Sequence, residues 1–131
     1  MTADAEGFID LGADAGNAVV LRPDLQTTVT ALTMVDLLVE AGLPEGLMNV
    51  VIGDGPHIGP HVVERADYVM FTGSTATGKA IIKSSADTVK RLTLELGGND
   101  AGIVLPDADP KAIAEGLFWG AFINTGQTCA A

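Results

Sequence analysis

The only cysteine of this chain, Cys129, lies in a segment suited to nucleophilic chemistry. It follows Gly126, Gln127 and Thr128 near the end of the sequence. A cysteine thiolate is a strong nucleophile toward carbonyl carbons and can form a covalent intermediate. A lone cysteine is also commonly a small, buried packing residue. The residue type alone therefore leaves a catalytic role and a packing role open.

Upstream, Glu95 offers a carboxylate that could work with such a nucleophile. It stands between Leu94 and Leu96 and is followed by Gly97 and Gly98. Burial of a carboxylate in an apolar strand is costly unless the group is paired, solvated or protonated, and the two glycines indicate an opening into a site. A thiolate that attacks a carbonyl and a carboxylate that activates water form a coherent two-step covalent scheme.

A glycine-rich turn, residues 73–78, lies between an apolar run and a helical pattern. Its backbone N–H groups and the helix dipole would favour an anion such as a pyrophosphate. The plain alternative is a tight strand-to-helix turn, because glycine often marks such turns. With Lys79 the segment is also a near match to a P-loop, but Ala80 stands where that motif needs a hydroxyl to hold magnesium.

The histidines do not add a second catalytic centre. His57 and His61 flank Gly59 and Pro60 in a weak helical segment. We expect them to have a surface or packing role rather than to form a Cys–His dyad or a metal site. No metal site is predicted.

Short apolar strands alternate with helices along the chain, which predicts an α/β fold with a parallel sheet and helices on both faces. In the final helix, Asp109 is the expected cap and Pro110 suits the first turn, while Ile113, Leu117, Ala121 and Phe122 make one apolar face. The expected strands are residues 18–21, 48–52, 68–71, 91–96 and 102–105, and the expected helices are residues 28–41, 58–65, about 75–86 and about 110–122.

Composition limits the possible partners. The chain has 131 residues, 47% of them hydrophobic, and a formal net charge of -10. Such a charge disfavours nucleic acid and anionic membranes as partners. The sequence has no apolar run long enough to span a bilayer and no signal-peptide pattern at its start, so we expect a cytoplasmic protein with one domain.

Three segments in this order, residues 71–78, 94–98 and 122–130, resemble the signatures of the NAD(P)-dependent aldehyde dehydrogenase superfamily. Residues 16–23 and 42–46 are similar to the same family, so the resemblance runs from about Gly12 onward and leaves 1–11 poorly matched. It implies a Rossmann-like fold that is incomplete relative to the family. Residues 1–131 would form a partial NAD(P)-binding domain, with the catalytic and oligomerisation domains absent.

The resemblance also implies roles for individual residues. Cys129 would attack an aldehyde, hydride would leave for the nicotinamide of NAD or NADP, and Glu95 would activate the water that hydrolyses the thioester to a carboxylic acid. The full-length parent would be a homo-oligomer. The residues expected to bind the cofactor are Arg22, Gly55, Pro56, Gly73, Ser74, Thr77, Gly78, Leu96 and Gly97.

The chain departs from the family pattern at several points, one of them Asn99-Asp100, where Lys followed by a small or polar residue is commoner. Family members usually have Lys-Pro-x-Glu where this chain has Arg22-Pro23-Asp24-Leu25, which leaves NAD versus NADP open. The Pro-Trp-Asn segment that supplies the oxyanion-hole asparagine is absent. Two functions follow: a portion of an aldehyde dehydrogenase, or a non-catalytic truncated remnant that acts as a nucleotide-binding or subunit-interaction module.

Overall fold

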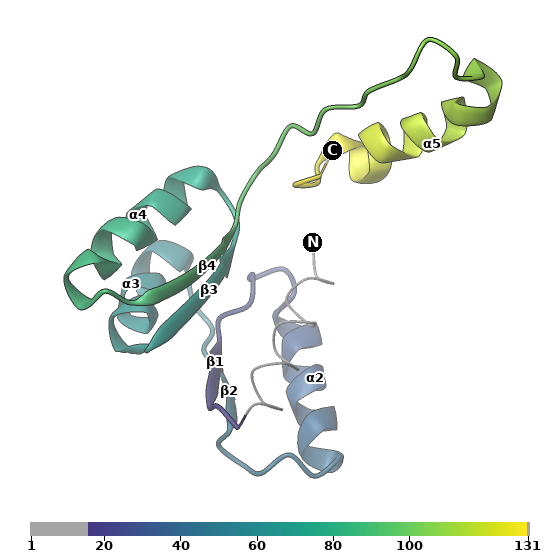
Figure 1. Cartoon of the computed structure of the whole chain (residues 1–131). Coiled ribbons are helices and arrows are strands. Elements are labelled where there is room, and N and C mark those ends of the chain that lie inside the picture. The colour runs from purple at the N-terminus through teal and green to yellow at the C-terminus, as the bar shows by residue number, and fades with distance from the viewer. Residues whose placement is uncertain (1–15, 131) are drawn as a thin grey trace.

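The computed structural model describes residues 16–130, in which short strands and helices alternate (Figure 1). This alternation confirms the α/β fold class that the sequence predicts. In chain order the elements are β1 (Val19–Leu21), α2 (Thr28–Glu40), β2 (Met48–Val50), α3 (Gly55–Arg65), β3 (Tyr68–Thr72), α4 (Thr75–Ser85), the 3-10 turn η1 (Ala86–Thr88), β4 (Arg91–Glu95), α5 (Pro110–Phe122) and the 3-10 turn η2 (Ile123–Gly126).

The first unit joins β1, β2 and α2. The strands are parallel, with Val19 opposite Met48, and α2 packs against β2. Ala31 of α2 and Met48 are buried. The helix ends as its stop signal predicts: Gly42 adopts a φ of +105°, which a residue with a side chain rarely does.

The second unit carries the larger core. β3 and β4 are parallel, and α4 forms the connection between them. Val63 of α3, Val69 of β3 and Ile81 of α4 form a buried cluster, against which Phe71, Leu92 and Leu94 pack. This cluster joins α3 and α4 to one face of the strand pair.

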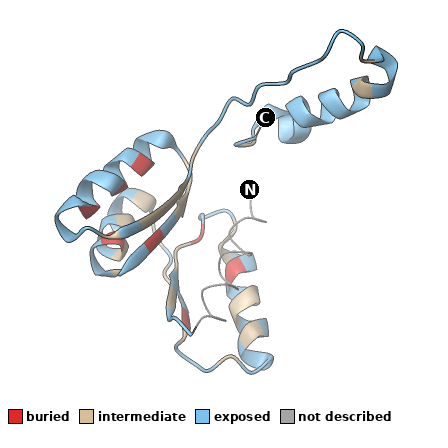
Figure 2. Ribbon diagram, viewed as in Figure 1, coloured by how far each residue is buried: buried red, intermediate tan, exposed pale blue. Residues whose placement is uncertain are grey.

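The described strands form two separate two-stranded sheets rather than one continuous sheet. Side chains alternate between the faces of a strand, so Tyr68 and Met70, the neighbours of Val69, point away from α3 and α4. On that face Tyr68 and Met70 are exposed. In Figure 2 few of the described residues have the colour of buried residues.

Helix α3 begins earlier than the sequence analysis predicts. The sequence predicts a helix from residue 58, whereas α3 starts at Gly55. The carbonyl of Asp54 accepts hydrogen bonds from the N–H groups of His57 and Ile58, which builds the first turn. Pro56 favours this start because a proline in the first turn loses no intrahelical hydrogen bond.

The predicted strand at residues 102–105 is wrong for the described chain. These residues lie in the extended segment between β4 and α5 and pair with no other described strand (Figure 1). Ile103 is 85% exposed. An apolar run becomes a strand only where another strand offers backbone partners, and residues 16–130 place none beside it.

Helix α5 begins as predicted but does not bury its apolar face. Asp109 accepts a hydrogen bond from the Lys111 N–H, and Pro110 occupies the first turn. The aromatic ring of Phe118 packs against the rings of Trp119 and Phe122, yet all three residues are more than half exposed. None of the helices within residues 16–130 has the length and apolar character to cross a membrane.

Candidate functional site

The parallel pairing of β3 and β4 brings two predicted site segments together. Thr72 at the end of β3 lies opposite Glu95 at the end of β4. The Gly73 N–H donates a 2.9 Å hydrogen bond to the Glu95 carbonyl oxygen. The glycine-rich turn and the candidate base therefore share the carboxyl edge of the strand pair, the edge at which α/β folds bind ligands.

The helix after this turn presents a capped N-terminus. The Ser74 hydroxyl accepts a 3.2 Å hydrogen bond from the Thr77 N–H, and the two side-chain hydroxyls lie 2.9 Å apart. N–H groups in the first turn of a helix have no intrahelical acceptor, and the helix dipole favours negative charge there. The start of α4 thus has the chemistry of an anion site.

At Gly73 and Gly78, neither of which has a positive φ, an added Cβ would meet the ends of neighbouring side chains, which would have to shift. A Cβ on Gly78 would lie 2.7 Å from a methyl group of Leu96, and one on Gly73 would lie 2.6 Å from the Phe71 ring. The absence of a side chain at Gly78 allows α4 to approach the end of β4 closely.

A left-handed turn precedes the candidate nucleophile. Asn124, Thr125 and Gly126 have φ values of 51°, 59° and 72°. A β-branched residue such as Thr125 seldom adopts this conformation, and such strain is concentrated at functional sites. The Gln127 N–H donates to the Asn124 carbonyl at 3.1 Å, and the Asn124 side chain donates back to the Gln127 carbonyl at 3.2 Å. The turn therefore sets the direction in which the chain reaches Cys129.

Glu95 and Cys129 line one pocket of about 310 Å³. Both residues are exposed and Cys129 is a free thiol. The buried packing role that the sequence left open for Cys129 is therefore wrong, and Glu95 lies in solvent rather than in an apolar interior. The other residues that line the pocket are Thr72, Gly73, Ser74, Leu96, Gly97, Gly98, Gln127 and Thr128.

Four of these lining residues were missed by the sequence analysis: Thr72, Gly98, Gln127 and Thr128. Each is a neighbour of a predicted site residue in the same motif, which is the signal that could have found them. The hydroxyl oxygen of Thr128 is buried without a hydrogen-bond partner in the described structure. A polar atom of this kind is available to a ligand or a water molecule.

The remaining predicted cofactor residues form a second cluster between β1 and the start of α3. The Arg22 guanidinium donates two hydrogen bonds, of 3.1 and 2.9 Å, to the Gly53 carbonyl. A Cβ on Gly55 would stand 3.5 Å from the same guanidinium, and Pro56 follows in the first turn of α3. Arg22, Gly55 and Pro56 are thus neighbours, as expected of residues that serve one ligand.

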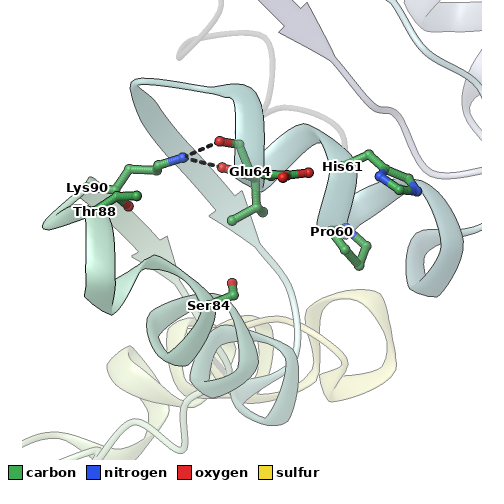
Figure 3. A pocket seen from close by; sticks show the side chains of 7 residues that line it. Pro60, His61, Glu64, Ser84, Thr88 and Lys90 are labelled. Carbon is green, nitrogen blue, oxygen red and sulfur yellow. Dashed lines mark hydrogen bonds between the residues drawn. The ribbon is translucent and has the colours of Figure 1, made fainter.

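Another pocket, of about 320 Å³, lies where α3 meets the end of α4, and Figure 3 shows its lining. The Lys90 ammonium donates hydrogen bonds to the carbonyls of Val63 and Glu64 in the last turn of α3. These bonds give Lys90 a structural role as a helix cap. His61 also lines this pocket, whereas exposed His57 contacts Asp54. Within residues 16–130 no cluster of His, Cys, Asp or Glu is arranged to hold a metal ion.

Comparison with known proteins relates these features to one family. A model of the aldehyde dehydrogenase family matches residues 12–131. The chain is 45% identical over 116 residues to a mitochondrial succinate-semialdehyde dehydrogenase of Oryza sativa subsp. japonica, a match that covers 87% of this chain and 22% of that protein.

Solved structures agree with this assignment. The NAD⁺ complex of an aldehyde dehydrogenase from Bacillus cereus superposes with a TM-score of 0.82 at 45% identity, covering 87% of this chain and 24% of that one. An NADP-dependent enzyme of E. coli superposes with a TM-score of 0.81 at 38% identity, covering 86% of this chain and 24% of that one. The chain spans about a quarter of the length of these relatives. On the match of the family model over almost its whole length, this chain belongs to the aldehyde dehydrogenase family.

Proposed function

We propose that this chain is part of an NAD(P)-dependent aldehyde dehydrogenase that oxidises an aldehyde to a carboxylic acid. One observation carries the proposal: Glu95 and Cys129 line the same pocket at the carboxyl edge of β3 and β4. A nucleophile and a base in one open pocket suit a reaction with a covalent intermediate. Membership of the family supports the choice of an aldehyde as substrate.

The residues around this pocket fit a dinucleotide. The N-terminus of α4, where the Ser74 hydroxyl accepts the Thr77 N–H, suits a pyrophosphate, and Gly73 and Gly78 present no side chain in this turn. Leu96 and Gly97 extend the same pocket. When bound, the cofactor supplies the hydride acceptor.

Arg22, Gly55 and Pro56 suit the adenosine half of the dinucleotide. The guanidinium is held by the Gly53 carbonyl, so its remaining N–H groups can serve a ribose or a ribose phosphate. The Bacillus cereus relative is a complex with NAD⁺ and the E. coli relative is NADP-dependent, so we propose NAD or NADP for this chain.

The chain's own residues would perform two steps. The Cys129 thiolate attacks the aldehyde carbon, a C–S bond forms, and the carbonyl oxygen becomes an alkoxide. After hydride leaves that carbon, a thioester on Cys129 remains. Glu95 then takes a proton from water while the water oxygen attacks the thioester carbonyl. The C–S bond breaks and releases the carboxylic acid and the Cys129 thiolate.

The proposal also covers the domain organisation, the oligomeric state and the location of the protein. Residues 1–131 would be a partial NAD(P)-binding domain, in which residues 1–11 lie outside both the family match and the described residues. The full-length enzyme would be a homo-oligomer. A cytoplasmic location remains our prediction, and the rice relative is mitochondrial by name.

A second function, nucleotide binding without turnover, has one observation in its favour. No side chain of α5 is buried, and Cys129 beyond it is exposed. In the described residues, therefore, the nucleophile stays exposed beside an α5 that has no buried side chain. The 131-residue polypeptide could bind a dinucleotide at α4 and still leave an aldehyde unconverted.

The test compares the 131-residue polypeptide with a full-length enzyme that carries this segment. In the full-length enzyme we expect NAD(P)H formation with aldehydes, and we expect Cys129→Ala to abolish it while the remote control Ser84→Ala does not. The polypeptide alone should show no turnover, since a single missing oxyanion donor already costs about 10² to 10³ in rate. Aldehyde oxidation by full-length Cys129→Ala at the unsubstituted rate would overturn the proposal.

A further inference from the structure

The two glycines after Glu95 have different surroundings. A Cβ built on Gly97 meets no atom within 4 Å. A Cβ built on Gly98 would lie 2.2 Å from the backbone carbonyl oxygen of Cys129. The second glycine therefore touches the main chain of the candidate nucleophile, whereas the first faces open space.

The requirement at Gly98 is one of space and not of backbone conformation. Its φ lies outside the left-handed region, so an alanine could adopt the same backbone there. A carbon atom at 2.2 Å is more than 1 Å inside ordinary van der Waals contact. The obstacle is a backbone atom, which cannot rotate away as the end of a flexible side chain can, so the Cys129 segment itself would have to move.

We propose that Gly98 is a positioning residue for the nucleophile: its missing side chain seats the Cys129 backbone against the end of β4, beside Glu95. This inference rests on the proposed function. Glu95 is fixed by its pairing opposite Thr72, so a side chain at position 98 would push Cys129 away from a base that stays in place. A displacement of 1 Å in reacting groups can cost about 10² in rate.

The experiment uses Gly98→Ala in a full-length enzyme that carries this segment. We expect kcat for aldehyde oxidation to fall by at least about tenfold. The rate of Cys129 alkylation by iodoacetamide should change as well, while the Kd for NAD(P)H stays within about twofold of the unsubstituted enzyme because the added Cβ would meet Cys129 and Asp100 and no atom of α4. Unchanged cofactor binding also shows that the variant is folded.

The matched control is Gly102→Ala. Gly102 lies four residues further along the same segment, and a Cβ there meets nothing within 4 Å. We expect this variant to keep the kcat and the alkylation rate of the unsubstituted enzyme. If Gly98→Ala behaves like Gly102→Ala, the positioning role is wrong even though the enzyme is active and the proposed function holds.

A second variant separates the two atoms near position 98. The Asp100 carboxylate oxygen would lie 3.2 Å from the added Cβ, a much milder contact. If the Cys129 carbonyl is the obstacle, Gly98→Ala/Asp100→Ala should remain as slow as Gly98→Ala. Recovery of kcat in the double variant would contradict the proposal, because it would trace the loss to Asp100. Absence of aldehyde oxidation in the unsubstituted enzyme would instead refute the proposed function.

Discussion

Ser74 combines a structural contact with a proposed ligand contact, and two substitutions separate them. Its hydroxyl caps α4 by accepting the Thr77 N–H. Ser74→Ala removes the cap and should lower the free energy of unfolding by about 1 kcal/mol. Ser84→Ala is the matched control, since it removes a hydroxyl within the same helix that donates to the Ile81 carbonyl. Urea unfolding of both variants measures the difference, and equal stabilities would contradict the capping role.

Ser74→Asp extends the prediction to binding. An aspartate caps a helix about as well as serine, so stability should be retained. Its negative charge would repel a pyrophosphate at the start of α4, and we expect the Kd for NAD(P)H to rise at least tenfold. Fluorescence titration of bound NAD(P)H gives this value. An unchanged Kd would mean that the cofactor phosphates do not bind at the N-terminus of this helix.

At the residue scale, the sequence was informative where chemistry and local spacing coincide. Glu95, Cys129 and the turn at residues 73–78 were identified from their motifs, and the structure places all three around one pocket. The contact between Gly98 and Cys129 could not be predicted in this way. It joins residues far apart in sequence. Only the tertiary fold decides which of the two adjacent glycines has another part of the chain where its side chain would be.

At the scale of elements, Lys90 holds the end of α3 against the strand that follows η1. Its ammonium donates to the carbonyls of Val63 and Glu64, and Val63 belongs to the core. Lys90→Met keeps a long stem but loses these bonds, so we expect the free energy of unfolding to fall by about 1 kcal/mol. Lys79→Met, at an exposed site within α4, should change stability little. If Lys90→Met lowers the free energy of unfolding no more than Lys79→Met does, the capping role of Lys90 is wrong.

Helices were predicted better than their surroundings. The apolar period located α2 and α5, and Asp109 and Pro110 marked the start of α5, because a helix closes its hydrogen bonds within its own segment. Residues 102–105 have a composition typical of a strand, but a strand depends on a partner elsewhere in the chain. None of the described residues offers one, and the segment stays extended and unpaired.

At the scale of the whole molecule, exposed apolar side chains should drive association of the 131-residue polypeptide. Phe118, Trp119 and Phe122 form a contiguous exposed group on α5. We expect concentration-dependent dimers or larger species in sedimentation velocity. Added salt should strengthen association because it screens the net charge of -10.

The matched pair for this prediction lies on α5. Trp119→Glu removes a large apolar side chain and adds a charge, whereas Ala114→Glu adds the same charge without that loss. We expect Trp119→Glu to weaken association far more than Ala114→Glu does. A monodisperse monomer at high concentration, with a sharp thermal transition, would contradict the prediction. It would show that the described core folds stably without association.

The most direct measurement of the proposed chemistry is a rapid-mixing experiment on Glu95→Gln in a full-length enzyme that carries this segment. In the proposed mechanism Cys129 acts in the first half-reaction and Glu95 in the second, so the two steps can be separated in time. We predict a burst of about one NAD(P)H per active site at the unsubstituted rate, followed by slow steady turnover. A missing burst would mean that Glu95 acts before hydride leaves, and an unchanged steady rate would mean that Glu95 is not the base.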